Sequence, residues 1–379
     1  MSDDSHTANS APALPTTQRA WIIERRGPPE KALRLHHDWP VPKPQPGEVL
    51  VRVQAAALNP VGYKLMALLP NFAARRPLPA EYDFAGTIAD ANGAAGYKVG
   101  DPVFGFVEVS QSFKTRQGAL AEYVRVPATA IAPRPANVPA TGAAGITLAG
   151  ETAYQSLFRA DALALSPLGR LEPGQSVFVN GGSSSVGAFA IQLAKAKGAA
   201  RVVASASGAN EAYVRALGAD ASVDYTRGPV HAQLARGAGQ EGQLAGSGTK
   251  FHLIVDAVGL TDPALYTHSA AYLAPGGVYV STGYHPRSLT TKEFSLALKH
   301  AVSTVWPRAL GGTPRRHWLV MLHHKEEDLK DIAGLLAEGS VKPVVDSVFA
   351  FEDALKAYER ILTNRAKGKV VVKVDPDVE

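Results

Sequence analysis

A glycine- and serine-rich turn separates an apolar run from a helical pattern in "VFVNGGSSSVGAFAIQLAKAKGA". Small residues let backbone N–H groups approach a phosphate, and the start of the following helix favours negative charge. Gly181 would make the tight turn, and Gly187 would let the helix pack close to the strand. The turn therefore predicts a cradle for the pyrophosphate of a dinucleotide. Its residues are Gly181, Gly182, Ser183, Ser184, Ser185, Val186 and Gly187.

The match to the dinucleotide-binding pattern is incomplete, because the strict pattern has glycine where this chain has Ser184. An ordinary strand–turn–helix built from small residues is the alternative interpretation. Repeated strand–helix units follow this turn along the chain, and they favour the cradle.

The end of the second strand, "ARVVASASGANEAY", bears on the choice of cofactor. An acid there would hold the ribose hydroxyls of NAD and repel a 2′-phosphate. This chain has Ser205 and Ser207 instead, and its next carboxylate is Glu211, so NADPH is favoured over NADH. Arg215 or Arg227 would have to reach in to add a positive charge. The alternative is that both serines simply cap the strand end.

The elements that would position these residues fall into two groups. Residues 19–135 contain short β-like runs with frequent glycine and turn signals, which indicates a β-rich, partly barrel-like domain. From about residue 176 strands and helices alternate, which predicts a doubly wound parallel sheet. The fold class is therefore α/β. We expect a disordered tail at 1–18, a discontinuous β-rich catalytic domain at 19–149 and 312–379, and a cofactor domain at 150–311.

Composition excludes several classes of protein. The 379 residues are 46% hydrophobic and 19% charged, which is typical of a globular protein with two domains. The net charge of +5 is scattered, so no nucleic-acid partner is expected. No apolar run approaches the roughly 20 residues that cross a bilayer. The N-terminus resembles neither a signal nor a transit peptide, so we expect a cytoplasmic protein. The chain has no cysteine, so we expect neither disulfides nor a thiolate-bound zinc.

With these motifs assembled, the chain resembles the medium-chain dehydrogenase/reductase superfamily. The closest resemblance is to the zinc-free branch of zeta-crystallin-like quinone oxidoreductases and enoyl reductases. The motifs that carry it, in family order, are "AALNPVGYKL", "YDFAGTI", "GDPVFGF", "GALAEYV", "ETAYQSL", "NGGSSSVG", "GADASVDY", "VDAVG", "APGGVYVSTG" and "GKVVV". The resemblance implies a GroES-like catalytic domain and a Rossmann domain that binds NADP.

The resemblance implies zinc-independent, NADPH-dependent reduction of the C=C bond of α,β-unsaturated carbonyls or quinones by hydride transfer. Asn59, Tyr63 and Lys64 would face the substrate in the cleft between the domains. Lys64 would be the electrophile or proton source. The alternative is that Lys64 is a surface charge and Tyr63 a packing residue.

The resemblance also implies contacts with the cofactor. Thr152 would lie near the nicotinamide, above the Val258–Gly259 turn, and Tyr225 would lie near the 2′-phosphate. The nicotinamide carboxamide would meet the segment Ser281, Thr282 and Gly283, and Lys369 would be a further cation on the cofactor side.

Two departures from the family pattern stand out. Gly62 replaces an acid that relatives usually have, so a local hydrogen bond or cap should be missing. Tyr82 stands where glycine is usual, which should reshape the turn. The doublets His36–His37 and His323–His324 show no zinc-ligand pattern, and we interpret them as surface histidines.

Three functions remain open. The first is a monomeric or homodimeric reductase of a small-molecule enone, quinone or acyl thioester. The second is a trans-acting enoyl reductase that serves a polyketide synthase, with Arg308, Arg315 and Arg316 attracting an acidic carrier domain. The third is a relative that binds the cofactor without catalysis.

Overall fold

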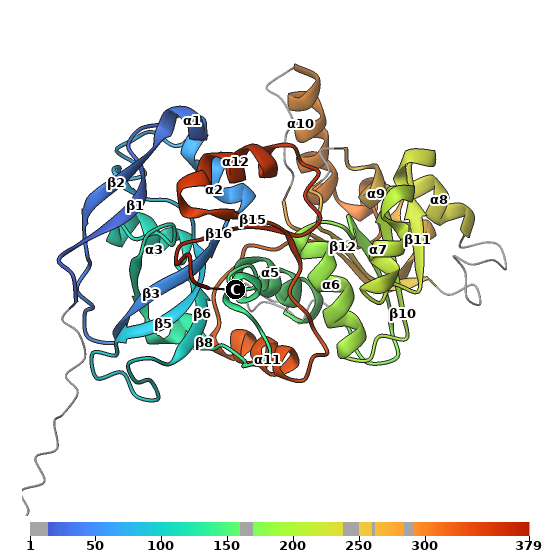
Figure 1. Ribbon diagram of the computed structural model, residues 1–379. Coiled ribbons are helices and arrows are strands. Elements are labelled where there is room, and N and C mark those ends of the chain that lie inside the picture. The colour runs from blue at the N-terminus through green and yellow to red at the C-terminus, as the bar shows by residue number, and fades with distance from the viewer. Residues whose placement is uncertain (1–13, 160–169, 238–249, 260–261, 284–290, 379) are drawn as a thin grey trace, which may run out of the picture.

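The computed structural model describes residues 14–159, 170–237, 250–259, 262–283 and 291–378. Two lobes lie side by side in Figure 1, each built on a large sheet. The predicted combination of a β-rich lobe with a parallel-sheet lobe is confirmed.

The first lobe contains a seven-stranded sheet of order β15-β16-β3-β5-β6-β8, with β7 also paired to β3, and a three-stranded sheet of order β2-β1-β4. Most of its pairs are antiparallel, and most residues of β3 are buried. The strands are β1 (Thr17–Ile23), β2 (Leu33–Pro40), β3 (Glu48–Ala57), β4 (Leu78–Pro79), β5 (Asp83–Asp90), β6 (Pro102–Phe106), β7 (Tyr123–Pro127), β8 (Ile131–Pro133), β15 (Val345–Ala350) and β16 (Lys369–Lys373).

The second lobe is a six-stranded parallel sheet of order β11-β10-β9-β12-β13-β14. All residues of its central strand β9 are buried, as expected for a parallel sheet covered by helices on both faces. The strands are β9 (Ser176–Asn180), β10 (Arg201–Ala206), β11 (Ala221–Asp224), β12 (Phe251–Asp256), β13 (Leu273–Ser281) and β14 (Arg316–Leu319).

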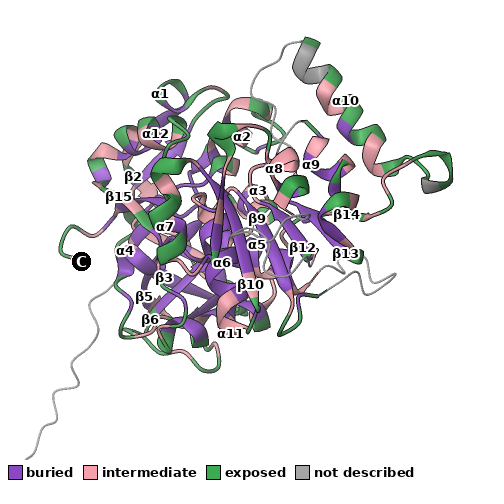
Figure 2. Ribbon diagram, turned by 90° about the vertical axis from the view of Figure 1, so that its right-hand side faces the viewer, coloured by how far each residue is buried: buried purple, intermediate pink, exposed green. Residues whose placement is uncertain are grey.

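Helix α5 contacts both lobes, because it packs against β6 of the first and against α6 and β12 of the second. It lies near the centre of Figure 1, whereas Figure 2 shows α10 projecting from the body. The helices are α1 (Pro29–Ala32), α2 (Pro60–Leu68), α3 (Val109–Thr115), α4 (Ala140–Ala143), α5 (Thr147–Phe158), α6 (Ser185–Ala196), α7 (Glu211–Ala216), α8 (Val230–Gly237), α9 (Ala264–Thr267), α10 (Thr291–Val305), α11 (Glu326–Ala337) and α12 (Ala354–Leu362).

The structure differs from the expected boundaries in three places. Strand β14 pairs with β13, so the parallel sheet continues past residue 311, where we expected the return to the first lobe. This strand is a short, half-buried edge, and its sequence therefore lacks a continuous apolar run. Helix α5 spans the expected boundary at 149/150. Thr17 and Gln18 belong to β1 rather than to a tail, while residues 1–13 lie outside the described residues.

Candidate active site

The turn from β9 into α6 requires glycine at two positions. Gly181 has a φ of 82°, and a Cβ added there would collide with Val258 Cγ2. A Cβ on Gly187 would collide with the carbonyl oxygen of Gly181. Ser184 is the N-cap of α6, and its Oγ accepts a hydrogen bond of 3.1 Å from the N–H of Gly187. Serine therefore suits the position where the strict pattern has glycine.

The first turn of α6 offers hydrogen-bond donors. The backbone N–H groups of Ser185 and Val186 have no acceptor within the part of the chain that the structure describes. Unpaired N–H groups at the start of a helix are suited to an anion, because the helix dipole adds to their partial charge. The turn therefore fits the pyrophosphate of a dinucleotide.

Ser205 is bonded inside this turn. Its hydroxyl donates to Asn180 Oδ1 over 2.6 Å and accepts from the N–H of Gly181 over 2.8 Å. The residue is 1% exposed, and its single hydroxyl hydrogen already has an acceptor. We expected Ser205 to donate a hydrogen bond to a phosphate. In the structure its hydroxyl instead stabilises the turn through these two hydrogen bonds.

Ser207 and Tyr225 each follow the end of a strand, and the two strands, β10 and β11, are paired. Ser207 is half-buried and Tyr225 is 54% exposed, so both are accessible to a ligand. The two arginines considered for the 2′-phosphate have acidic partners. Arg215 forms an ion pair of 3.0 Å with Glu211. Arg227 lies 3.4 Å from a carboxylate oxygen of Asp224.

Asp256, at the end of β12, organises the turn that faces Gly181. Its Oδ1 accepts hydrogen bonds from Asn180 Nδ2 (2.9 Å) and from the N–H groups of Val258 (3.1 Å) and Gly259 (3.3 Å). Thr282 donates its N–H and its hydroxyl to the carbonyl oxygen of Asp256. We did not single out Asp256 from the sequence, although it belongs to the quoted "VDAVG" motif.

The segment from Ser281 to Gly283 lies directly beside this turn. The N–H of Gly283 donates to Ser281 Oγ over 3.0 Å. The predicted contact of this segment with the carboxamide stays a prediction.

In the first lobe, Asn59, Asp83 and Lys369 form a buried triangle. Asp83 Oδ2 lies 3.0 Å from both Asn59 Nδ2 and Lys369 Nζ, and Lys369 also donates to Asn59 Oδ1. The three residues are at most 2% exposed. Asn59 and Lys369, expected to touch the substrate and the cofactor, thus use their polar groups within the protein.

Glu81 lies next to both departures from the family pattern and accounts for the one at Gly62. Its Oε2 accepts from the N–H of Asn59 over 3.0 Å, and its Oε1 accepts from the hydroxyl of Tyr358 over 2.6 Å. Asn59 is the N-cap of α2, and Gly62 is the third residue of that helix. An acid at the third position commonly accepts a hydrogen bond from the backbone N–H of the N-cap residue. Glu81 makes this bond instead, so the cap we expected to be missing is present. In the turn that contains Tyr82, the preceding residue Glu81 has the left-handed backbone, with a φ of 62°.

Burial shifts the titration of this part of the first lobe. Burial raises the pKa of Glu81 to about 7, although the hydrogen bond from Tyr358 and the charge of Lys369 act in the opposite direction. Burial also lowers the pKa of Lys64 and, together with the charge of Glu81, raises the pKa of Tyr63.

Tyr63 and Lys64 lie on α2 and are half-buried. The ring of Tyr63 packs against the core of the first lobe. Neither Tyr63 Oη nor Lys64 Nζ has a hydrogen-bond or ion-pair partner among the described residues. Lys64 is therefore a partly desolvated cation available to a ligand.

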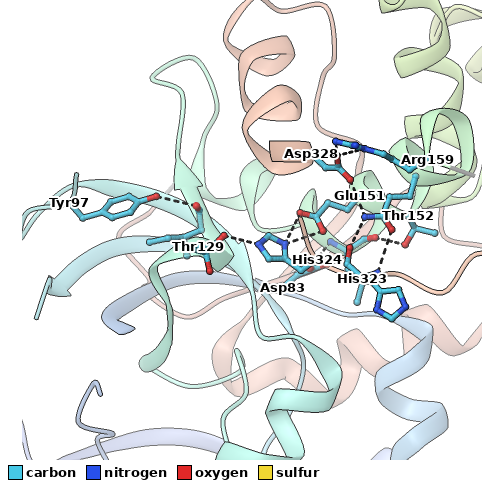
Figure 3. Close-up of polar contacts among 12 residues, drawn as sticks. Asp83, Tyr97, Thr129, Glu151, Thr152, Arg159, His323, His324 and Asp328 are labelled. Atoms are coloured by element: carbon cyan, nitrogen blue, oxygen red, sulfur yellow. Dashed lines mark hydrogen bonds and ion pairs between the residues drawn. The ribbon is translucent and has the colours of Figure 1, made fainter. Parts of the chain in front are cut away.

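Figure 3 shows a polar cluster around the first turns of α5. Asp83 Oδ1 accepts from the N–H of Leu148 over 2.9 Å, which ties the helix to β5. Thr152 donates its hydroxyl to the carbonyl oxygen of Leu148 and is 9% exposed. Its neighbour Glu151 is fully buried and lies 2.9 Å from His324 Nδ1.

The interpretation of His324 as a surface histidine was wrong. Its side chain is 11% exposed, and its Nε2 lies 2.7 Å from the carbonyl oxygen of Thr129. Burial lowers the pKa of His324, but the hydrogen bond and charge of Glu151 outweigh burial and raise it. Burial raises the pKa of Glu151 itself to about 7. The isolated motifs contained no signal for this pair, because the two residues are 173 positions apart.

Two family models match the chain. "Alcohol dehydrogenase GroES-like domain" matches residues 45–136, and "Zinc-binding dehydrogenase" matches residues 217–372. The chain belongs to the medium-chain dehydrogenase/reductase superfamily. The resemblance seen in the motifs is thereby confirmed, and the chain lies with the quinone oxidoreductases and enoyl reductases of this superfamily.

Individual relatives support this assignment to the superfamily. The chain is 33% identical to a trans-enoyl reductase of Aspergillus terreus, over 96% of this chain and 98% of that protein. It is 32% identical to the chloroplastic NADPH-dependent alkenal/one oxidoreductase of Arabidopsis thaliana, over 95% of this chain and 80% of that protein. The structure of the quinone oxidoreductase from Coxiella burnetii superposes with a TM-score of 0.70 at 25% identity, covering 94% of this chain and 99% of that one.

Within the described ranges, no group of three or more His, Cys, Asp or Glu side chains could hold a metal ion. Among the helices described, none combines the length and apolar composition needed to span a membrane.

Proposed function

We propose that the protein uses NADPH to reduce the C=C bond of small α,β-unsaturated carbonyl compounds or quinones. Its relatives, among them a trans-enoyl reductase and an alkenal/one oxidoreductase, support an oxidoreductase of the enoyl and enone reductase type. The observation that carries the proposal is the turn from β9 into α6, where the N–H groups of Ser185 and Val186 lack acceptors in the described part of the chain. The similarity to an NADPH-dependent alkenal/one oxidoreductase supports the choice of cofactor.

The pyrophosphate would lie on the N–H groups at the start of α6. Ser207 and Tyr225 would meet the 2′-phosphate, and Thr152 the nicotinamide, with the Val258–Gly259 turn beneath it. When bound, the nicotinamide supplies the hydride. Ser205 and Asp256 would keep the two turns in place through the hydrogen bonds described above.

Lys64 would face the carbonyl oxygen of the substrate. That oxygen gains negative charge when hydride reaches the β-carbon, and a nearby cation or hydrogen-bond donor stabilises it. The lowered pKa of Lys64 also makes it a better acid, so it could deliver the proton that completes the reduction. Asn59 and Lys369 would act through the buried triangle that holds the start of α2.

The test is a panel of enones, quinones and acyl thioesters with NADPH consumption followed by absorbance. Lys64→Met removes the cation with little change in side-chain length, and we expect kcat/KM to fall about tenfold or more while NADPH binding is kept. Lys31→Met, at an exposed position on α1, is the matched control. A folded wild type that binds NADPH but reduces nothing in the panel would reject the function and favour a relative without catalysis.

Service to a polyketide synthase is a second candidate, favoured by the similarity to a trans-enoyl reductase. Arg316 is exposed, whereas Arg315 donates to the carbonyl oxygens of Leu273 and Ala270, and the side chain of Arg308 lies outside the described residues. An acyl group on a carrier domain should then be reduced faster than the same free thioester.

The cytoplasmic location and the monomeric or homodimeric state stay predictions.

A further inference from the structure

The imidazole of His324 joins three segments that are far apart in the sequence (Figure 3). Thr129 belongs to the short 3₁₀ helix Ala128–Ala130 between β7 and β8 of the first lobe. Glu151 lies on α5, and His324 itself lies between β14 of the second lobe and α11. The single ring thus links α5 to the first lobe at the point where the chain returns from the parallel sheet.

The two contacts of the ring determine how many protons it shares with Glu151. A carbonyl oxygen can only accept, so Nε2 must carry a hydrogen toward Thr129. Nδ1 faces the carboxylate at 2.9 and 3.2 Å, so one further proton lies between His324 and Glu151. Whichever of the two holds that proton, the pair has no net charge.

The surroundings of Glu151 favour keeping this proton. The carboxylates of Asp83 and Asp328 both face Glu151. Asp83 is balanced by Lys369, and Asp328 by Arg159 over 2.8 Å. Loss of the shared proton would leave Glu151 as a third, unbalanced carboxylate among them, which is costly in a buried place.

The surroundings of His324 contain one further charged group. Glu108, which precedes α3, also faces His324 and favours its protonated form. The ring of Phe106 meets the imidazole edge-on at 5.4 Å and limits its access to water.

We propose that Glu151 and His324 are positioning residues whose one-proton bridge holds α5, and with it Thr152, in place against the first lobe during hydride transfer. The inference rests on the proposed function for the role of Thr152. Asp83 ties the start of the same helix to β5, so the bridge is a second attachment one turn further along α5. At alkaline pH the shared proton leaves, the bridge is lost, and hydride transfer slows.

The variant Glu151→Gln removes the titrating proton but keeps the hydrogen bonds of the bridge. Its amide N–H can donate to Nδ1 of a neutral His324, whose Nε2–H still donates to Thr129, so the bridge remains without a titrating proton. We expect kcat within about threefold of the wild type at pH 6.5, and no alkaline fall. An alkaline fall identical to that of the wild type would overturn the proposal.

Variants of His324 remove the bridge itself. We expect His324→Gln and His324→Ala to lower kcat about tenfold or more at pH 6.5, where the wild type keeps the bridge, to raise the isotope effect with deuterated NADPH, and to change the KM for NADPH less than about threefold. His323→Ala, on the adjacent side chain, is the matched control and should behave as the wild type. Folded His324 variants with the kcat of the wild type would overturn the proposal.

A readout without substrate keeps this inference separate from the proposed function. In cofactor-free protein, the ¹⁵N signals of His324 should show Nε2 protonated at every pH, and the Nδ1 signal should change with pH only when Glu151 is present. An unprotonated Nε2 would contradict the bridge. A wild type that reduces no acceptor would reject the proposed function, while these signals would still report on the pair.

Discussion

The carboxylate of Glu81 occupies the space that a side chain on Gly62 would need. A Cβ added to Gly62 would lie 2.5 Å from Glu81 Oε1. An acid at position 62 and Glu81 are therefore alternative ways to bond the N–H of Asn59, and this chain uses the second.

Gly62→Asp should destabilise the protein by about 2 kcal/mol or more, because it forces two carboxylates into one buried space. Urea unfolding measures this change. The double variant Gly62→Asp/Glu81→Gly should recover part of the loss, since the introduced carboxylate can bond the N–H of Asn59 and glycine suits the left-handed backbone at position 81. Strictly additive effects of the two substitutions would contradict this coupling.

The stability of the protein should fall as pH rises from about 5 to 7.5, in part because of Glu81. Its pKa is raised from 4.5 to about 7 in the folded protein. Between these values the folded state binds more protons than the unfolded state, so this contribution is complete below pH 4.5 and is lost as pH rises through 7. Urea unfolding of Glu81→Gln at both pH values should show a smaller fall. An unchanged pH dependence in this variant would exclude Glu81 as its source.

Gly187→Ala should weaken NADPH binding about tenfold or more, because the added Cβ collides with the carbonyl oxygen of Gly181 and moves α6 away from the turn. A fluorescence titration with NADPH measures the affinity. Gly276→Ala is the control, since a Cβ there meets no atom within 4 Å. Equal affinity in the two folded variants would reject the cradle.

NADPH should exceed NADH in kcat/KM about tenfold, and Ser207→Asp should remove this preference by placing a carboxylate near the 2′-phosphate. Steady-state kinetics with both cofactors test the claim, and the change should be in the KM for NADPH. Ser205→Ala should instead impair both cofactors alike, because Ser205 bonds Gly181 and Asn180 in the turn. Equal efficiency of the wild type with both cofactors would defeat the prediction.

Local patterns in the sequence determined the lobes and the cofactor turn. Gly181, Gly187 and the helix after them are close in sequence, and their small side chains and helical pattern follow from local geometry. The alternation of strands and helices likewise predicted the parallel sheet, because each unit is a local arrangement. The edge strand β14 was not predicted from the sequence, because it is short and half-buried.

Only the tertiary structure decided which polar groups are already paired. Ser205 and Lys369 were expected to contact the cofactor and Asn59 the substrate, yet the structure pairs their polar groups with residues elsewhere in the chain. Glu151 and His324 meet across 173 positions, and Glu81 meets Tyr358 across 277. Residue type determines which hydrogen bonds a side chain can make. Tertiary packing, within each lobe and around α5, determines which of these bonds it makes, and therefore which groups remain available to a ligand.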